Sequence, residues 1–321
     1  MATPALELLF KHFPSAKFDY FIGYRPVAEI VRSYPQTRHI YLKRGGFETV
    51  RQIYELRKNR YDYVLITSGH SSWKSCLFAN LLKTGCTIGD YEGNISFFDK
   101  ATKRSRNSHR MTCNLLMVKN AFGINETTPA QPKVTISSPQ NDAIIKEIVG
   151  TGKTVIGIHC GSRETQSYKR WPTEHFRQLL ALIHQNNADA FFLIFATGTE
   201  QQEARVITNQ STHCSLILDK PLSIVMGLIQ RCRLMIANDS GIGHLAAAVG
   251  TPTLSIFGPS DPGKCAPVGA HCRHIRAEGF CKPCIDGTVP SKCGETAECM
   301  AVLKPETVYK LVAGLLEETG H

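Results

Sequence analysis

The sequence predicts an α/β protein with two Rossmann-like domains, each built on a parallel β-sheet. Short apolar runs of the kind that parallel sheets bury recur along the chain, and helical patterns separate them. The stretch 126–150 interrupts this alternation with prolines and polar neighbours, which is typical of a linker. A chain of 321 residues is long enough for two domains of ordinary size. We therefore expect domains over 1–125 and 151–304, followed by a helical segment over 305–321.

The first domain alternates helix and strand signals from its start. Its clearest strand is the continuous apolar run YVLIT at 63–67. Such an alternation favours parallel pairing, with helices on both faces of the sheet. The expected helices are 4–12, 26–33, 49–59, 73–82 and 109–122, and the expected strands are 18–22, 39–42, 63–67 and 86–88.

The second domain repeats the pattern, after a short expected helix at 140–149 in the linker. Its longest internal helix, 172–186, has apolar residues spaced for one face. A cysteine-rich loop is expected over 265–299 and a final helix over 305–318. The other expected strands are 154–159, 190–195, 216–218, 234–237 and 253–257, and the other expected helices are 200–208, 223–231 and 244–249.

The turn after the strand 234–237 holds the strongest ligand-binding signal. Asp239, Ser240 and Gly241 precede a helix, so free backbone N–H groups and the positive end of the helix dipole point at one place. Gly241 lets the backbone approach a pyrophosphate, Ser240 offers a hydroxyl, and Asp239 is expected to cap the helix. For His244, a packed core histidine and a ligand contact are equally good interpretations. We expect a phosphate site at the C-terminal ends of parallel strands; a structural cap without ligand is the alternative.

The charge balance favours anionic partners. The chain has 37 Lys and Arg against 27 Asp and Glu, a formal net charge of +10. We find no nucleic-acid-binding motif with interleaved aromatic residues, so nucleic acid is not an expected partner. A merely solvated basic surface is the alternative.

With no signal-peptide pattern and no run of 18 apolar residues, we expect a cytoplasmic protein.

Four motifs, in order, carry a resemblance to a known family. They are T-P-A-L at 3–6 with F-P at 13–14, the segment VIGIHCGSRETQSYKRWP at 155–172, T-G-T-E at 197–200, and D-S-G-x-x-H-L-A-A-A-x-G-x-P at 239–252 followed by F-G-P-S-D-P. This pattern resembles the heptosyltransferases of glycosyltransferase family 9, which build the inner core of bacterial lipopolysaccharide. The resemblance covers nearly the whole chain, and its last motif is the most specific.

The resemblance implies the GT-B architecture, with its two domains facing a cleft. It implies transfer of a heptosyl or similar unit from a nucleotide diphosphosugar, ADP-heptose above all, to a lipopolysaccharide core or other anionic glycolipid acceptor. No cofactor is then required for the chemistry. The expected place is the cytoplasm, and peripheral association with the cytoplasmic face of the inner membrane is left open.

The same resemblance implies roles for single residues. Lys169 would neutralise the leaving diphosphate and is the expected catalytic residue, and Glu200 would bind the ribose hydroxyls. The turn amides near Ser162 would help to hold phosphate or acceptor. Trp171 is expected to pack in the core, and Arg170 to be a solvated surface residue.

Four of the twelve cysteines stand apart from the others. Cys281, Cys284, Cys293 and Cys299 have the spacing C-x2-C-x8-C-x5-C, and four thiolates in one loop could hold a structural zinc or iron. Reduced or redox-labile cysteines are the alternative. Related protein heptosyltransferases that hold iron with a cysteine finger keep the metal hypothesis open. The remaining eight cysteines look like small buried hydrophobic residues.

The chain departs from the family pattern at its start. The family has a strand and an S-x-G-D turn before the T-P-A-L helix, and the Asp of that turn is thought to act as general base. Here Met1 and Ala2 stand directly before Thr3. We expect a gap in the N-terminal sheet and a missing base, for which His70 and Asp90 are weak substitutes. A non-catalytic nucleotide-sugar-binding or assembly homologue is therefore one alternative. The cysteine-rich loop leaves a protein heptosyltransferase as a second. A nucleotide-sugar epimerase is a third, although the paired acids and bases that it needs are not seen.

Overall fold

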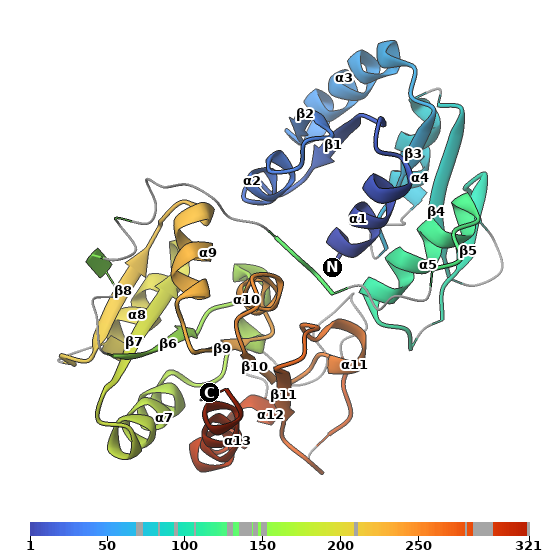
Figure 1. The fold of residues 1–321 in the computed structure, drawn as a ribbon. Coiled ribbons are helices and arrows are strands. Elements are labelled where there is room, and N and C mark those ends of the chain that lie inside the picture. The colour runs from blue at the N-terminus through green and yellow to red at the C-terminus, as the bar shows by residue number, and fades with distance from the viewer. Residues whose placement is uncertain are drawn as a thin grey trace. The chain divides into compact units, whose positions relative to one another are not determined.

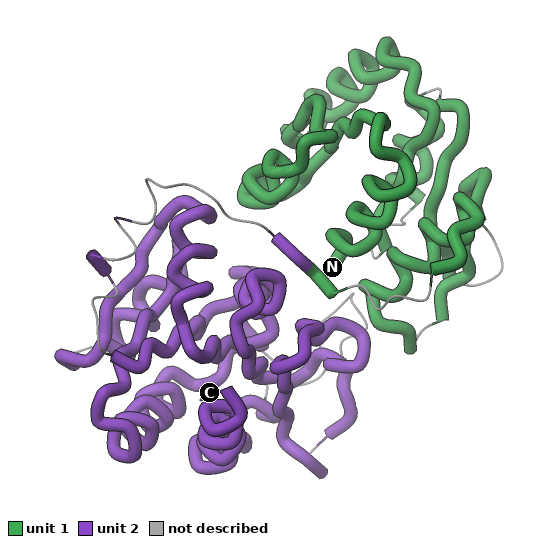
Figure 2. The backbone as a smooth tube through the Cα atoms, in the orientation of Figure 1, with its two compact units in different colours: residues 1–132 green, residues 133–321 purple. Residues whose placement is uncertain are grey.

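The chain divides into two compact units, residues 1–132 and 133–321 (Figure 2). The boundary between them falls inside the stretch 126–150 that was predicted as a linker. The computed structural model describes residues 1–68, 73–82, 84–92, 96–105, 107–126, 131–134, 143, 147–148, 153–208, 211–279, 281–284 and 298–319. Most of the predicted linker, its helix at 140–149 included, lies outside these residues.

Unit 2 is built on a six-stranded parallel sheet with the order β11-β10-β9-β6-β7-β8 (Figure 1). From β6 the chain proceeds to β7 and β8 on one side and later returns to β9 on the other side. The boundary between β6 and β9 is therefore a topological switch point, where ligands bind in open α/β sheets. The strands are β6 (Thr154–His159), β7 (Ala190–Ala196), β8 (Cys214–Leu218), β9 (Leu234–Asn238), β10 (Thr253–Phe257) and β11 (Cys272–Arg276).

Alternate side chains of these strands enter two cores, one on each face of the sheet. Ile156 and Ile236 belong to the core that includes residues of α7 and α13, whereas Val155 and Met235 belong to the core formed with α9 and α10. The helices of unit 2 are η2 (Glu164–Lys169), α7 (Thr173–Asn186), η3 (Gly198–Glu200), α8 (Gln201–Thr208), α9 (Leu222–Gln230), α10 (Gly241–Ala248), α11 (Pro262–Cys265), α12 (Glu298–Ala301) and α13 (Pro305–Glu318).

Among the described residues of unit 1, five strands form two separate parallel sheets, β1-β2 and β3-β4-β5. The helix α1 contacts both groups: Leu9 lies in a core with Ile88 of β4, and the ring of Phe10 meets that of Phe18 of β1 edge-on at 4.9 Å. The elements are α1 (Thr3–His12), β1 (Phe18–Ile22), α2 (Val27–Arg32), β2 (Thr37–Leu42), α3 (Gly46–Leu56), η1 (Arg57–Asn59), β3 (Tyr63–Leu65), α4 (Trp73–Leu81), β4 (Cys86–Tyr91), β5 (Lys100–Lys103) and α5 (Arg110–Phe122).

A network centred on Asp19 joins the two sheets of unit 1. The carboxylate accepts two hydrogen bonds from Arg38 of β2, at 2.9 and 2.8 Å, and one from the hydroxyl of Tyr61, at 2.8 Å. Tyr61 lies two residues before β3. The side chain of Asp19 therefore links β1 both to its partner strand β2 and to the second sheet.

The fold corrects the sequence prediction at two strands and at the start of one helix. The strands β5 and β11 were not predicted, because their residues KATK and CRHIR are mostly polar or charged. The helix expected from His244 begins three residues earlier, at Gly241. Within the described residues, no helix has both the length and the apolar character that crossing a bilayer demands.

Candidate functional site

Polar turns follow the carboxyl ends of four neighbouring strands in unit 2. They are residues 160–162 after β6, 197–200 after β7, 239–241 after β9 and 258–261 after β10. Because all four strands are parallel, their carboxyl ends meet at one edge of the sheet, on both sides of the switch point. The residues predicted from separate motifs are therefore brought together here.

Asn238, the last residue of β9, fixes the spacing of this edge. Its side-chain amide donates to the carbonyl oxygen of Cys160 at 2.6 Å, and its oxygen accepts from the backbone N–H of Trp171 at 3.1 Å. The side chain is fully buried. Asn238 thus joins β9 to the turn after β6 and to the segment after η2. The sequence analysis did not single it out, although a polar residue at the end of an apolar strand was the available signal.

Lys169 and Asp239 form the main ion pair of the site. The ammonium Nζ lies 2.7 Å from Oδ2 of Asp239, and the two side chains are 13% and 9% exposed. The prediction that Asp239 caps α10 is wrong. Ser240 occupies the N-cap position, its side chain makes no capping hydrogen bond, and Gly241 begins the helix. The ion pair places a cation directly beside the N-terminus of α10.

A buried histidine that the sequence analysis missed connects two predicted ligand residues. Nδ1 of His159 lies 3.0 Å from Oγ of Ser240, and Nε2 lies 3.3 Å from Oε2 of Glu200. His159 ends β6 and is 6% exposed. The three residues come from β6, η3 and the turn after β9, so His159 links the two sides of the switch point. The signal that could have revealed it is a histidine at the end of an apolar strand.

Glu200 is buried and held in a fixed position. It forms a capping box with Thr197 at the start of η3, and its carboxyl group lies over Gly161, where any larger residue would clash with it. Burial by itself raises the pKa of Glu200, but the hydrogen bond and the charge of His159 bring it below its usual value. Glu200 is therefore a carboxylate whose hydrogen-bonding oxygens are positioned before any ligand arrives.

Arg170 corrects a further prediction, because it is not a solvated surface residue. Nη1 pairs with Oε1 of Glu203 at 2.6 Å, and the guanidinium also donates to Oγ and the carbonyl oxygen of Ser162. The hydroxyl of Ser162 donates to the carbonyl oxygen of Gln166 at 2.8 Å. The Ser162 hydroxyl is thus used in holding the turn after β6. Trp171 packs in the core as predicted, and its indole N–H donates to the carbonyl oxygen of Leu303.

His244 lies half-buried in the first turn of α10, next to the predicted phosphate-binding turn.

Of the proposed substitutes for the general base, Asp90 is only 1% exposed. It accepts a hydrogen bond from Ser68 at 2.5 Å and lies 3.6 Å from the guanidinium of Arg104. Asp90 therefore belongs to a buried structural network of unit 1. His70 lies outside the described residues.

Three of the four predicted metal ligands surround the turn after β10. The backbone N–H of Cys284 donates to the carbonyl oxygen of Pro259, and Arg276 donates both to the carbonyl oxygen of Gly258 and to Sγ of Cys281. Cys299 is buried, and burial raises its pKa to about 11. No three His, Cys, Asp or Glu side chains among the described residues form a metal-binding group. Cys293 lies outside these residues.

The other cysteines follow the prediction in part. Cys76, Cys113, Cys160 and Cys232 are buried, whereas Cys86, Cys214, Cys265 and Cys272 are partly exposed. Burial raises the pKa of Cys160 to about 12, so this thiol beside Glu200 stays protonated at neutral pH. Cys160 packs in a core of unit 2.

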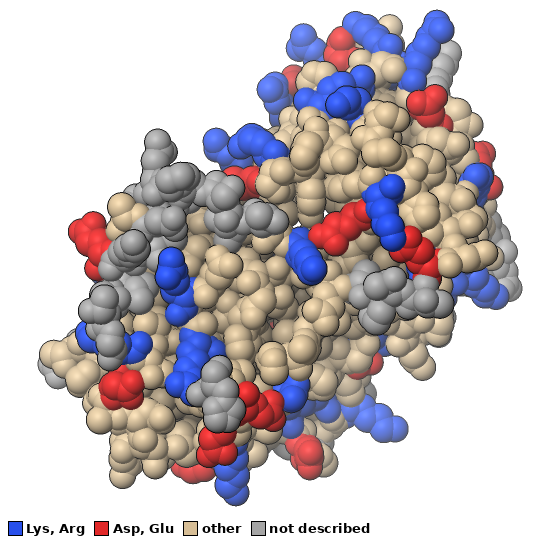
Figure 3. All heavy atoms as spheres, viewed as in Figure 1, with Lys and Arg blue, Asp and Glu red and all other residues tan. Residues whose placement is uncertain are grey.

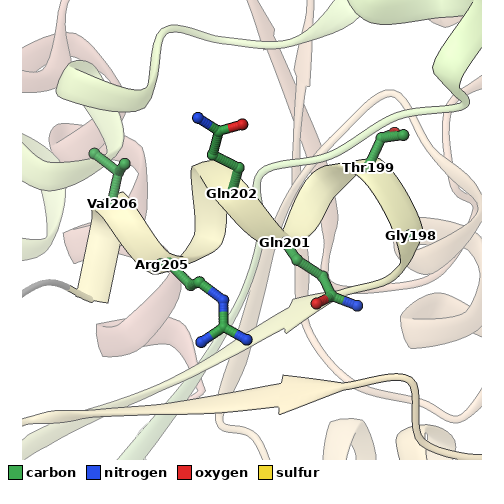
Figure 4. A pocket seen from close by; sticks show the side chains of 6 residues that line it. All are labelled: Gly198, Thr199, Gln201, Gln202, Arg205 and Val206. Carbon is green, nitrogen blue, oxygen red and sulfur yellow. The ribbon is translucent and has the colours of Figure 1, made fainter.

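A shallow hollow runs along η3 and α8, beginning at the T-G-T-E turn. It is lined by Gly198, Thr199, Gln201, Gln202, Arg205 and Val206 (Figure 4). Figure 4 shows Thr199, Gln202 and Val206 projecting from one side of these elements and Gln201 and Arg205 from the other. The hollow contains none of the predicted site residues, although Glu200 lies within the same turn.

Comparisons with known proteins agree on one family. Residues 50–293 match glycosyltransferase family 9 (heptosyltransferase). Lipooligosaccharide heptosyltransferase 2 of Campylobacter jejuni is 26% identical over 326 residues, which cover 99% of this chain and 95% of that protein. The structure of Escherichia coli ADP-heptose lipopolysaccharide heptosyltransferase II aligns with 100% of this chain and 95% of its own, with a TM-score of 0.76 at 19% identity. For Escherichia coli heptosyltransferase WaaC with ADP, the TM-score is 0.72 at 17% identity, over 98% and 95% of the two chains. The predicted fold class, a GT-B-type α/β fold with parallel sheets, is confirmed.

Proposed function

This chain belongs to glycosyltransferase family 9, the heptosyltransferases, and we propose that its glycosyl donor is ADP-heptose and its acceptor an anionic glycolipid of the lipopolysaccharide core. The enzyme is a glycosyltransferase that transfers heptose to the lipopolysaccharide core. The observation that carries the donor proposal is the position of Lys169 beside the N-terminus of α10, at the switch point of the sheet.

In the proposed complex, the diphosphate lies against the turn Asp239–Gly241. Backbone N–H groups at the start of α10 and the ammonium of Lys169 bind its oxygens, and Glu200 accepts hydrogen bonds from the ribose. Lys169 would then move part of its interaction from Asp239 to the diphosphate. His244 and the amides near Ser162 are the remaining proposed contacts.

The proposed chemistry is electrostatic. An acceptor hydroxyl oxygen forms a bond to the anomeric carbon while the bond from that carbon to the diphosphate oxygen breaks. The electron pair of the broken bond leaves with the diphosphate, and the acceptor proton leaves to a base. Lys169 and the amides at Ser240 and Gly241 stabilise the negative charge that develops on the leaving group, and this effect is the main catalytic contribution of unit 2.

Replacing the lysine tests this assignment. Lys169→Ala should lower kcat/KM by about tenfold or more, because one cation is lost at the developing charge. Lys310→Ala, at an exposed position of α13, is the matched control and should keep wild-type rates. An unchanged rate in Lys169→Ala would reject the role. ADP binding by a wild-type protein that shows no turnover with any glycolipid acceptor would favour the non-catalytic alternative.

The acceptor proposal stands on the distribution of charge. Unit 1 has 19 Lys and Arg against 10 Asp and Glu, a net charge of +9, whereas unit 2 has 18 against 17, a net charge of +1. A basic unit attracts phosphates and carboxylates of a glycolipid. We further propose that the protein works as a peripheral protein at the cytoplasmic face of the inner membrane, where such an acceptor would be reached. Nucleic acid is not a proposed partner.

A structural zinc or iron held by Cys281, Cys284, Cys293 and Cys299 is a separate proposal. It is supported by the gathering of three of these cysteines around the turn after β10, and it has no part in the chemistry proposed above. Metal analysis of freshly purified protein tests it. About one equivalent that is lost in Cys284→Ser supports the site, and less than a few tenths of an equivalent contradicts it.

A further inference from the structure

Helix α3 has large apolar side chains on a buried side and on an exposed side. Thr49, Ile53 and Leu56 are buried against the rest of unit 1. Phe47 and Tyr54, which the helical period places on the other side, are 82% and 62% exposed. Val50 adds a further half-exposed side chain, 50%, to that outer side. Large apolar side chains that are exposed together on one side of a helix mark an interaction surface.

The neighbouring helix α4 repeats the arrangement. Cys76 and Ala79 are buried, whereas Trp73, Leu77 and Leu81 are 66%, 49% and 40% exposed. The two helices pack against each other. Their exposed apolar side chains therefore lie on neighbouring elements of the same unit. We call this set, Phe47, Val50, Tyr54, Trp73, Leu77 and Leu81, the outer apolar surface.

Cations surround the outer apolar surface. The guanidinium of Arg57 lies 5.9 Å from the ring centre of Tyr54, and the ammonium of Lys74 lies 5.7 Å from that of Trp73. Residues 43–60 contain six Lys and Arg but only two acidic residues, Glu48 and Glu55, each of which lies beside a basic side chain of the same segment. Figure 3 shows Lys and Arg side chains gathered where Figure 1 places α3.

We propose that the outer apolar surface, with its surrounding cations, binds to an anionic lipid membrane. Aromatic and aliphatic side chains would enter the boundary between headgroups and acyl chains, and Lys and Arg would meet the lipid phosphates. Trp and Tyr beside cations are the side chains that membrane interfaces favour. This inference rests on the proposed peripheral membrane association and assigns a surface to it.

The two tryptophans of the chain give a direct readout. Trp73 is largely exposed, whereas Trp171 is 1% exposed in the core of unit 2. On addition of vesicles of phosphatidylglycerol and phosphatidylcholine, fluorescence from Trp73 should shift to shorter wavelength, and brominated lipids should quench it. A Trp73→Phe protein, which keeps only Trp171, should show neither change while still sedimenting with the vesicles.

Sedimentation with the same vesicles measures the binding. Phe47→Ala/Trp73→Ala should lower the vesicle partition coefficient by about tenfold or more, because the protein loses two aromatic side chains that would enter the membrane. Arg51→Gln/Lys74→Gln should lower it several-fold, and raising the salt from about 0.1 to about 0.5 M should do the same to the wild type. Lys310→Gln/Leu311→Ala, an exposed cation and apolar residue on α13, is the matched control and should bind like the wild type.

The outcomes separate this surface from the proposal on which it rests. Wild-type binding that survives unchanged in both double variants overturns the assignment of the surface and leaves peripheral association standing. Wild-type protein that binds no anionic vesicle overturns both. Lipid-free protein that is dimeric, and becomes monomeric in Phe47→Ala/Trp73→Ala, would show that the surface joins two copies of the chain, which also overturns the inference.

Discussion

At the scale of single residues, the site depends on side chains that connect segments far apart in the sequence. Asn238 joins β9 to the turn after β6, and Lys169 pairs with a carboxylate 70 positions away. His159 reaches both Ser240 and Glu200. None of these three residues acts alone, so a substitution at any of them should alter the position of its partners.

The two ring nitrogens of His159 give separable predictions. In His159→Asn the side-chain amide can replace only Nδ1 and loses Glu200, so ADP binding should weaken about tenfold while pyrophosphate binding changes less. In His159→Gln the amide reaches Glu200 instead and loses Ser240, so pyrophosphate binding should suffer more. Calorimetry with both ligands measures the difference. If the two variants lose affinity for both ligands equally, the connecting role is wrong.

Asn238 is predicted to matter for stability more than for ligand contact. Asn238→Ala leaves the buried carbonyl oxygen of Cys160 and the N–H of Trp171 without their partner, so the free energy of unfolding should fall by about 2–4 kcal/mol. Asn238→Asp keeps an acceptor for Trp171 but loses the donor, and should not restore stability. Urea unfolding measures both variants; a loss below about 1 kcal/mol in Asn238→Ala would contradict this account.

At the scale of elements, unit 1 depends on the link that Asp19 makes between its two sheets. Burial by itself raises the pKa of Asp19, but hydrogen bonds from Arg38 and Tyr61 bring it below its usual value. A carboxyl group with a lower pKa in the folded state stabilises the fold above its unfolded-state pKa. That stabilisation is lost as the pH falls through the folded-state pKa.

The link therefore predicts a specific dependence of stability on pH. Asp19→Asn should be less stable than the wild type at pH 7, because the amide cannot pair with Arg38 in the same way. The difference should shrink as the pH falls below about 4 and the wild-type carboxyl group protonates. Thermal unfolding of both proteins at a series of pH values measures it. A difference that stays constant down to about pH 2 would contradict the ionic origin of the link.

At the scale of the whole molecule, the charge is divided unequally between the units. Nearly all of the formal excess of +10 belongs to unit 1. The proposed anionic acceptor would therefore be attracted mainly by unit 1, whereas a single lysine of unit 2, Lys169, is proposed to meet the donor diphosphate. Long-range attraction of this kind weakens as salt screens the charges.

The charge division predicts how the two substrates respond to salt. Raising the salt from about 0.05 to about 0.3 M should increase the KM for a phosphorylated glycolipid acceptor several-fold, with a smaller change in the KM for the nucleotide sugar. Steady-state kinetics with each substrate varied in turn gives both values, and an acceptor lacking phosphate is the control. Equal changes in the two KM values would contradict the proposal that the charge of unit 1 attracts the acceptor.

The sequence determined the class of fold and selected the candidate site, because both follow from local patterns. A short apolar run such as Leu234–Ala237 specifies a buried strand wherever it lies, and Asp239–Gly241 specify a turn that leads into a helix. The motifs also selected Lys169 and Glu200, which the fold brings to the same edge of the sheet. The sequence did not predict polar edge strands such as β11, because their stability comes from one neighbouring strand and not from an apolar pattern of their own.

Only the tertiary structure decided which side chains meet. That Asp239 pairs with Lys169 instead of capping α10, that Arg170 holds the turn at Ser162, and that His159 lies between Glu200 and Ser240 all depend on the strand order β9-β6-β7. Local sequence specifies how a segment folds and which face it buries. Strand order is set by how the helices and strands pack together as a whole, so the partners of a buried charge cannot be derived from the residues around it.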